Sequence, residues 1–330
     1  MTTAFIGELE KLARAGGGAP VAGILERLGR PTSVVVTGRR GVGRGCVTTA
    51  LRSRGITVDD GADAPDVTVV VVAEAVKPED VAAIRTATAP VLVLLTKADL
   101  AGVGPNGPIE VARRRAEEQA RRIGVPIVPV VGLLAALAPG DVTDDLVVAL
   151  RRFVTEPPDL TGVDAFVTAP HSVGEDVRRQ LLALLDRFGV AHAVLALQAG
   201  RDADQLAARL AEVGNVIEVM TALDAVAAQA RYRRLRGAIA ELHCLADLFD
   251  DSALQELMVA DVTALAAMSA AVDVVTAAGL VVDRGDTAAA HLRRARTWRS
   301  YGRGPVTALH RQCSGDLVRG SLRLWDGRRA

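Results

Sequence analysis

Residues 33–45 read Ser33-Val34-Val35-Val36-Thr37-Gly38-Arg39-Arg40-Gly41-Val42-Gly43-Arg44-Gly45, and they give the clearest indication of fold class. The first five residues form an apolar, mostly β-branched run, which is typical of a buried strand. The glycines that follow predict a tight turn, and the sequence from Gly43 to Arg54 is a helix candidate. A buried strand that leads through glycines into a helix is the expected start of an α/β domain.

Three more apolar runs are predicted to be strands, and the charged segments between them are predicted to be helices. Strands that alternate with helices need crossover connections, so we expect a parallel sheet covered on both faces, over residues 31–156. The predicted strands are Val67–Ala73, Val91–Leu95 and Val125–Val131, and the predicted helices are residues 77–88, 109–123 and 144–154.

The segments on either side of this α/β domain are expected to be helical. Residues 1–30 are predicted to form an N-terminal helical segment of two short helices, divided by Gly16-Gly17-Gly18. Residues 157–330 are predicted to form a mainly helical domain, in which Ala193–Leu197 also fits a strand. The helices expected in the later part are residues 202–213, 216–249, 253–281, 286–303 and 306–324.

Composition and charge exclude several classes of protein. Half of the 330 residues are apolar, which excludes a disordered chain, and the net charge is zero, so no overall field favours nucleic acid. Three cysteines without paired spacing fit a reducing compartment. The N-terminus lacks the pattern of a secretory signal, and the longest apolar runs are shorter than a bilayer span. We therefore expect a cytoplasmic protein.

The glycine-rich turn has the chemistry of a phosphate-binding loop. Glycines let consecutive N–H groups point at a phosphate, and the N-terminus of the next helix adds its positive end. Gly38 and Gly43 have the spacing of the Walker A pattern, but Arg44 stands at the lysine position and Gly45 at that of the metal-binding hydroxyl. The alternative is a plain strand-to-helix turn. The predicted phosphate-binding residues are Gly38, Arg39, Gly41, Gly43, Arg44 and Gly45.

Leu95-Thr96-Lys97-Ala98-Asp99 directly follows the third predicted strand and resembles the [N/T]-K-x-D motif of the Ras-like and Era-like phosphate-loop GTPases. The resemblance implies that Asp99 accepts two hydrogen bonds from guanine, that the stem of Lys97 packs along the base, and that Thr96 orients the loop. It also implies that Gly132, after the fourth strand, offers its N–H to the guanine carbonyl, although the usual serine is absent. The alternative is a helix-capping Asp99 beside a solvated Lys97.

The segments that hold a metal ion and sense the terminal phosphate in such GTPases have no clear counterpart. Only about ten residues separate the first helix from Asp66, and Ile56–Gly61 does not match Asp-x-x-Gly. Asp63 and Asp66 are possible neighbours of a metal ion without a motif. The resemblance implies GTP or GDP as the ligand. Because these segments have no clear counterpart, we expect Mg²⁺ binding and hydrolysis to be weakened or lost, and we assign no catalytic residue.

The C-terminal, mainly helical half of the chain resembles the helical regions of bacterial dynamin-like GTPases. The resemblance lies in the general residue pattern and not in a defined motif. The residues that suggest this are Leu185–Val190 and the arginine-rich Arg231–Arg236. Residues 241–286 carry nine acids and one arginine, whereas residues 290–330 carry ten arginines and two aspartates. The basic segment Arg293–Arg329 is expected to contact anionic lipid, at the inner face of the membrane, or an acidic partner. The alternative is that it packs against the acidic helix.

The leading functional hypothesis is a guanine-nucleotide-binding, GTPase-like protein with weak or absent hydrolysis. It would act as a regulatory or scaffold partner, for which a dynamin-like GTPase is the candidate that the resemblance implies. Two alternatives keep a related fold: a competent GTPase that completes its site in a dimer, and a nucleotide-free interaction module. A further alternative is an NAD(P)-binding oxidoreductase, because Gly38, Gly41 and Gly43 precede Asp59 and Asp60; Cys46 stands where that pattern needs its last glycine.

Overall fold

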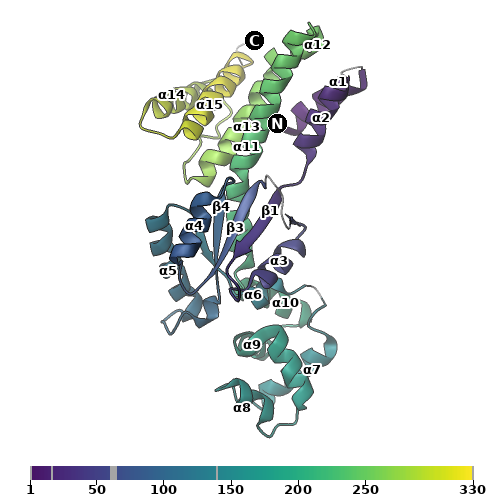
Figure 1. Cartoon of the computed structure of the whole chain (residues 1–330), viewed down its shortest axis with the longest axis vertical. Helices are drawn as coiled ribbons and strands as arrows, with labels where there is room; N and C mark the ends of the chain where they lie inside the picture. Colours follow the sequence, from purple (N-terminus) through teal and green to yellow (C-terminus); the bar gives the residue numbers. More distant parts are fainter. Residues whose placement is uncertain (1, 16–17, 60–64, 139, 329–330) are drawn as a thin grey trace. The chain divides into compact units, whose positions relative to one another are not determined.

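A computed structural model describes residues 2–15, 18–59, 65–138 and 140–328 and divides the chain into two compact units (Figure 1). The first, called here the helical unit, comprises Met1–Thr32 and Asp224–Ala330, and the second, the α/β unit, comprises Ser33–Leu223. This division differs from the three expected segments. The N-terminal helices belong with the C-terminal ones, and residues 157–223 belong with the sheet.

The α/β unit contains a five-stranded parallel sheet in the order β2-β1-β3-β4-β5. Neighbouring strands pair in register: Val36 of β1 lies opposite Val69 of β3, which lies opposite Leu92 of β4. The parallel sheet and the three longer strands therefore confirm the sequence prediction. The strands are β1 Ser33–Gly38, β2 Thr57–Val58, β3 Val67–Ala73, β4 Val91–Thr96 and β5 Ile127–Pro129.

Helices follow the strands, as the alternating pattern predicts. On one side of the sheet, Val70 and Val93 are buried in one cluster with Ile84 of α4 and Ala116 of α5. The helices that connect the strands, or follow the last one, are α3 Arg44–Arg52, α4 Pro78–Thr86, α5 Gly107–Ile123, α6 Gly132–Ala136 and α7 Asp144–Thr155, with a 3₁₀ turn at Ala98–Leu100 after β4.

Helices α8 Val163–Thr168, α9 Glu175–Gln198 and α10 Ala203–Val213 complete the α/β unit. They share one buried cluster with α7, in which Phe153 of α7 stacks edge-on against Phe166 of α8 at 5.8 Å. The strand alternative for Ala193–Leu197 is wrong, because this segment lies in α9, where Ala193 and Ala196 are buried at helical spacing. Burial against α7 explains why residues 157–223 join the sheet rather than the C-terminal helices.

Helix α9 is long and apolar enough, by length and composition, to cross a membrane, and α12 with α13 passes the same test as a pair bent by 49°. Within α9, however, Arg178 is buried and donates to the carbonyls of Phe166 and Ala169 at 2.9 and 2.8 Å. The helix is also broken by the non-helical backbone of Asp186. Both features fit a helix that packs inside a protein core.

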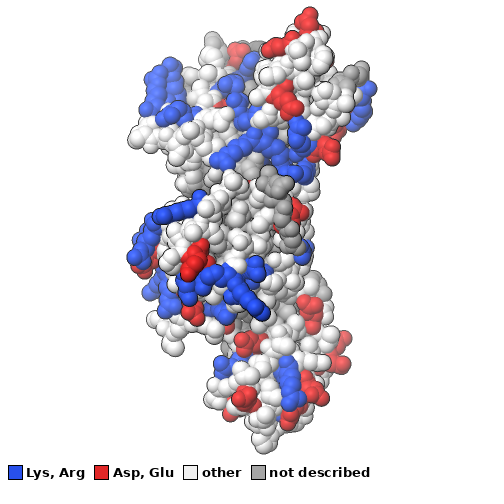
Figure 2. All heavy atoms as spheres, viewed as in Figure 1, with Lys and Arg blue, Asp and Glu red and all other residues white. Residues whose placement is uncertain are grey.

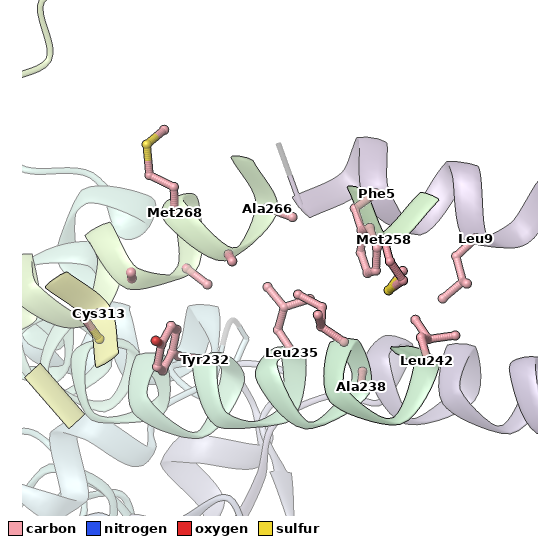
Figure 3. Close-up of a cluster of buried hydrophobic side chains, with 14 of the residues drawn as sticks. Phe5, Leu9, Tyr232, Leu235, Ala238, Leu242, Met258, Ala266, Met268 and Cys313 are labelled. Atoms are coloured by element: carbon pink, nitrogen blue, oxygen red, sulfur yellow. The ribbon is translucent and has the colours of Figure 1, made fainter. Parts of the chain in front are cut away.

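The helical unit is built around the C-terminal part of α11 Val216–Leu248. Leu235, Ala238 and Leu242 of α11 face α13 and the N-terminal α1, whose Phe5 and Leu9 lie over the same core (Figure 3). This packing explains why the first 32 residues belong to this unit. The other helices are α1 Thr2–Ala15, α2 Gly18–Gly29, α12 Ser252–Val259, α13 Asp261–Ala277, α14 Ala288–Arg303 and α15 Ala308–Asp326.

One buried polar network links α11 to α15. The Tyr232 hydroxyl donates to the Asp316 carboxylate at 2.7 Å, and Arg236 lies 3.4 Å from the other carboxylate oxygen. Asp316 is only 2% exposed and Tyr232 is fully buried. Burial and the bond to Asp316 raise the pKa of Tyr232, and burial raises the pKa of the nearby Cys313 to about 11. Both groups are therefore uncharged at neutral pH.

The basic C-terminal segment is partly paired with the acidic segment before it. Arg293 lies 3.1 Å from Asp283, Arg323 lies 3.4 Å from Asp261, and Arg328 pairs with Asp286. Trp298 of α14 is buried in the core of the unit. Arginines nevertheless cover the outer face of α14, where Figure 2 shows a group of basic side chains. Arg329, the end of the predicted basic segment, lies outside the described residues.

Candidate functional site

The glycine-rich loop lies where the sheet changes winding direction. After β1 the chain forms β2 on one side and then β3 on the other, and in open parallel sheets ligands bind outside the carboxyl ends of the strands at such a point. Gly38 ends β1 opposite Val71 of β3, with φ +147°, and a Cβ there would lie 2.4 Å from the Val71 carbonyl oxygen. Only glycine fits this close approach.

The loop then reaches α3 through Gly41 and Gly43, both with positive φ. Gly43 precedes the helix and has no side chain to cap it, so first-turn N–H groups of α3 are not engaged by a side-chain cap. Arg44 and Gly45, the first two residues of α3, are exposed. Arg44 makes no hydrogen bond or ion pair with any other described residue, which leaves its guanidinium available to an anion.

Arg39 is engaged elsewhere. Its Nε and Nη2 donate to the two oxygens of Asp80, at 3.0 and 3.2 Å, and the pair raises the pKa of Arg39. Asp80 is 2% exposed and also accepts the Lys77 N–H at the start of α4. The ion pair of Arg39 with Asp80 therefore links the glycine loop to α4. Because the Arg39 guanidinium is occupied by Asp80, it is less available to bind a phosphate.

The Thr96–Asp99 motif is in direct contact with the glycine loop. Thr96, buried at the end of β4, has its hydroxyl 2.5 Å from the carbonyl oxygen of Val42 and 3.0 Å from that of Val72. A Cβ on Gly43 would lie 3.6 Å from the same hydroxyl. One threonine thus bonds the loop after β1 to the ends of β3 and β4, which makes the two sequence motifs neighbours.

Lys97 and Asp99 follow in the turn after β4. Lys97 is exposed with a φ of +56°, and Asp99 is half-buried. Burial raises the pKa of Asp99, and the negative charge of Asp186 raises it further. Asp186 comes from the break in α9, and its proximity to Asp99 was not predicted, because nothing in the sequence indicates that α9 bends there.

Gly132 begins α6 directly after β5, and a Cβ there would lie 3.3 Å from Cβ of Cys46 in α3. The turn between α10 and α11 covers the same edge. The Gly214 carbonyl accepts the Val131 N–H at 3.2 Å, and the Asn215 amide donates to the Pro129 carbonyl at 2.7 Å. Sequence reasoning missed this cover, because residues 214–215 lie some eighty positions away.

Of the two acidic residues considered for a metal ion, Asp63 and Asp66, the structure describes only Asp66, which lies away from the glycine loop. Asp66 precedes β3 and bonds Ser33 at the start of β1, with 2.9 Å between the Ser33 nitrogen and the Asp66 carboxylate. Asp66 thus lies at the amino ends of β1 and β3, whereas Gly38 lies at the carboxyl end of β1. Asp66 is therefore not close enough to the glycine loop to share a metal ion with it. Asp59 pairs through its N–H with Val34, and Asp60 and Asp63 lie outside the described residues. No group of three or more metal-binding side chains occurs within the described part of the chain.

A comparison with protein-family models finds no match, and comparisons with curated proteins and with solved structures find none either. The candidate site therefore has to be interpreted from its own residues.

Proposed function

We propose that the α/β unit binds a guanine nucleotide at the carboxyl edge of its sheet and that it hydrolyses GTP weakly or not at all. The observation that carries this proposal is the contact of Thr96 with the Val42 carbonyl. It brings the turn that contains Asp99 beside the loop that contains Gly38, Gly41 and Gly43. Phosphate and base motifs that lie far apart in sequence are thus adjacent at the edge where parallel sheets bind ligands.

The roles follow from the chemistry of each group. Loop amides and the exposed Arg44 would bind the phosphates, Lys97 would cover the base, and the Asp99 carboxylate would accept its two N–H groups. Gly45 brings no hydroxyl to a metal ion, so little Mg²⁺-assisted hydrolysis is expected. The protein would then act as a nucleotide-dependent regulatory or scaffold partner of a GTPase paralogue. Its proposed location is the cytoplasm or the inner face of the membrane.

Fluorescent mant-GDP and mant-ADP titrations test the ligand. We expect mant-GDP to bind and mant-ADP not to, and Asp99→Asn to weaken mant-GDP binding roughly ten- to a hundred-fold, because hydrogen bonds to a charged acceptor are lost. Xanthine has a carbonyl where guanine has its amine, so the asparagine amide should improve binding of xanthosine diphosphate. Arg121→Gln, on the exposed face of α5, is the matched control. Equal or absent binding of the guanine and adenine nucleotides would contradict the proposal.

Binding should also depend on pH. An aspartate with a raised pKa loses its charge at a higher pH than an exposed one, and guanine needs the ionised form. Affinity for mant-GDP is therefore expected to be constant at neutral pH and to fall as the pH is lowered through the raised pKa of Asp99. Asp186→Asn removes the neighbouring negative charge and should move this fall to lower pH. An affinity that stays constant at low pH in the unsubstituted protein would contradict a role of the ionised Asp99 carboxylate in binding.

A second candidate is a nucleotide-free interaction module. It is favoured by the pairing of Arg39 with Asp80, and by the cover that Gly214 and Asn215 place over the end of β5. Under this alternative the glycine loop is purely structural, and Arg44→Ala alters neither nucleotide nor phosphate binding.

A further inference from the structure

A small cavity in the helical unit, remote in sequence from the glycine loop, has the composition of an anion site. It has a volume of about 190 Å³ and lies between α11, the start of α13, and α15. Three arginines and a histidine line it, and no acidic residue does so among the described residues. The basic groups are Arg236 and His243 of α11, seven positions apart on one helix face, and Arg319 and Arg323 of α15, four positions apart.

The positive charge of this cluster is only partly balanced. Arg236 and Arg319 share the carboxylate of Asp316, at 3.4 and 3.8 Å, and Arg323 lies 3.4 Å from Asp261. Charge-assisted hydrogen bonds are normally shorter, near 2.8 Å. Three guanidinium groups therefore face two carboxylates, one of which also accepts the Tyr232 hydroxyl. In addition, Nε of Arg236 is buried without a hydrogen-bond partner among the described residues.

The N-terminus of α13 adds a second source of N–H donors. Ala260, the residue before this 17-residue helix, has no side-chain oxygen, and no side chain caps the helix. Thr263 lines the cavity, but its hydroxyl donates to the Leu257 carbonyl at 2.7 Å and so does not cap either. Uncapped N–H groups at a helix N-terminus attract anions. Here the start of α13 lines the same cavity as the three arginines.

We propose that this cavity binds a phosphoryl group, carried by inorganic phosphate, a small phosphate monoester or a lipid headgroup. Arginine forks suit the oxygens of a phosphate, and the donors come from three directions that meet in one cavity. The site lies within the helical unit, so it does not depend on the nucleotide proposed for the α/β unit. The test can therefore separate the two sites.

Tryptophan fluorescence gives a readout confined to the helical unit, because both tryptophans and both tyrosines of the chain lie in it. The full-length chain is melted in increasing inorganic phosphate, with ionic strength held constant by sodium chloride. We expect a saturable rise in the melting temperature that chloride does not give. In Arg319→Gln/Arg323→Gln the apparent Kd should rise about ten-fold or more, since charged hydrogen bonds are removed.

Three variants control the interpretation. Ala260→Asp supplies a carboxylate at the helix N-terminus, so it should stabilise the unit by itself and abolish the response to phosphate. Arg296→Gln/Arg299→Gln removes two exposed arginines of α14 and should leave the response unchanged, as should Arg44→Ala in the glycine loop. A response that is lost in Arg44→Ala but kept in Arg319→Gln/Arg323→Gln overturns the proposal, and so does one that chloride reproduces.

Vesicles distinguish the source of the phosphoryl group. Phosphatidylcholine vesicles with and without phosphatidic acid are sedimented with the protein. Binding that requires phosphatidic acid, falls in Arg319→Gln/Arg323→Gln and is displaced by inorganic phosphate assigns the site to a headgroup. A phosphate response without vesicle binding assigns it to a soluble ligand. Failure of both phosphate and vesicles to respond to the arginine substitutions contradicts the proposal.

Discussion

Gly38→Ala is expected to destabilise the α/β unit by roughly 3–5 kcal/mol, the sum of a backbone clash and an unfavourable φ. The added Cβ would lie 2.4 Å from the Val71 carbonyl oxygen and 3.2 Å from a methyl group of Val42. Neither neighbour can withdraw easily, because Val71 is in the middle of the sheet and fully buried. We expect the folded structure of the glycine loop and of the carboxyl ends of β1 and β3 to be lost in one transition.

Gly41→Ala is the matched control for this substitution. Gly41 also has a positive φ, +83° against +147° at Gly38, but a Cβ there would meet nothing within 4 Å. Only conformational strain of about 1–2 kcal/mol is expected. Urea unfolding followed by circular dichroism measures both variants, while tryptophan fluorescence reports on the helical unit and should change little in either. If the two substitutions destabilise the protein equally, the close approach of Gly38 to β3 is wrong.

Asp316→Ala is expected to destabilise the helical unit by about 3–5 kcal/mol, because it removes one member of a buried charged network. The Tyr232 hydroxyl would lose its acceptor at 2.7 Å inside the core, and Arg236 would lose its ion-pair partner. The positive charge left at this point would have no compensation from α15. Asp316→Asn keeps the size and one acceptor oxygen, so its loss of stability should be smaller.

Asp326→Ala supplies the control on the same helix. Asp326 is exposed at the end of α15, and its removal should change stability by no more than about 0.5 kcal/mol. Tryptophan fluorescence follows all three variants, since Trp298 is buried in this unit. A small effect of Asp316→Ala, equal to that of Asp326→Ala, would show that the network contributes little.

The elements that the sequence predicted well are those with strong local signals. The β3 and β4 runs are continuous β-branched or leucine-rich segments, and both are buried strands. The long C-terminal helices have helical spacing and appear close to their expected bounds, except that residues 253–281 form two helices that meet at Ala260. The break leaves that junction with an uncapped helix N-terminus, which no local pattern indicated.

The site was predicted less completely, because several of its contacts join residues that are far apart. Arg39 was among the residues predicted to bind phosphate, yet its partner in the structure is Asp80, forty-one positions later. The negative charge of Asp186 that acts on Asp99 comes from the break in α9. Neither partner carries a motif, so neither could have been found before the chain was folded.

The sequence by itself determined four strands, β1, β3, β4 and β5, together with the glycine turn and the motif at Thr96–Asp99, because these depend on residue type and on spacing along a short segment. Only the tertiary structure decided that the first 32 residues pack with the last hundred, that Thr96 bonds the glycine loop, and that arginines of α11 and α15 converge on the start of α13. The physical reason is that burial and hydrogen bonding are satisfied by whichever groups the fold brings together, at any distance along the chain.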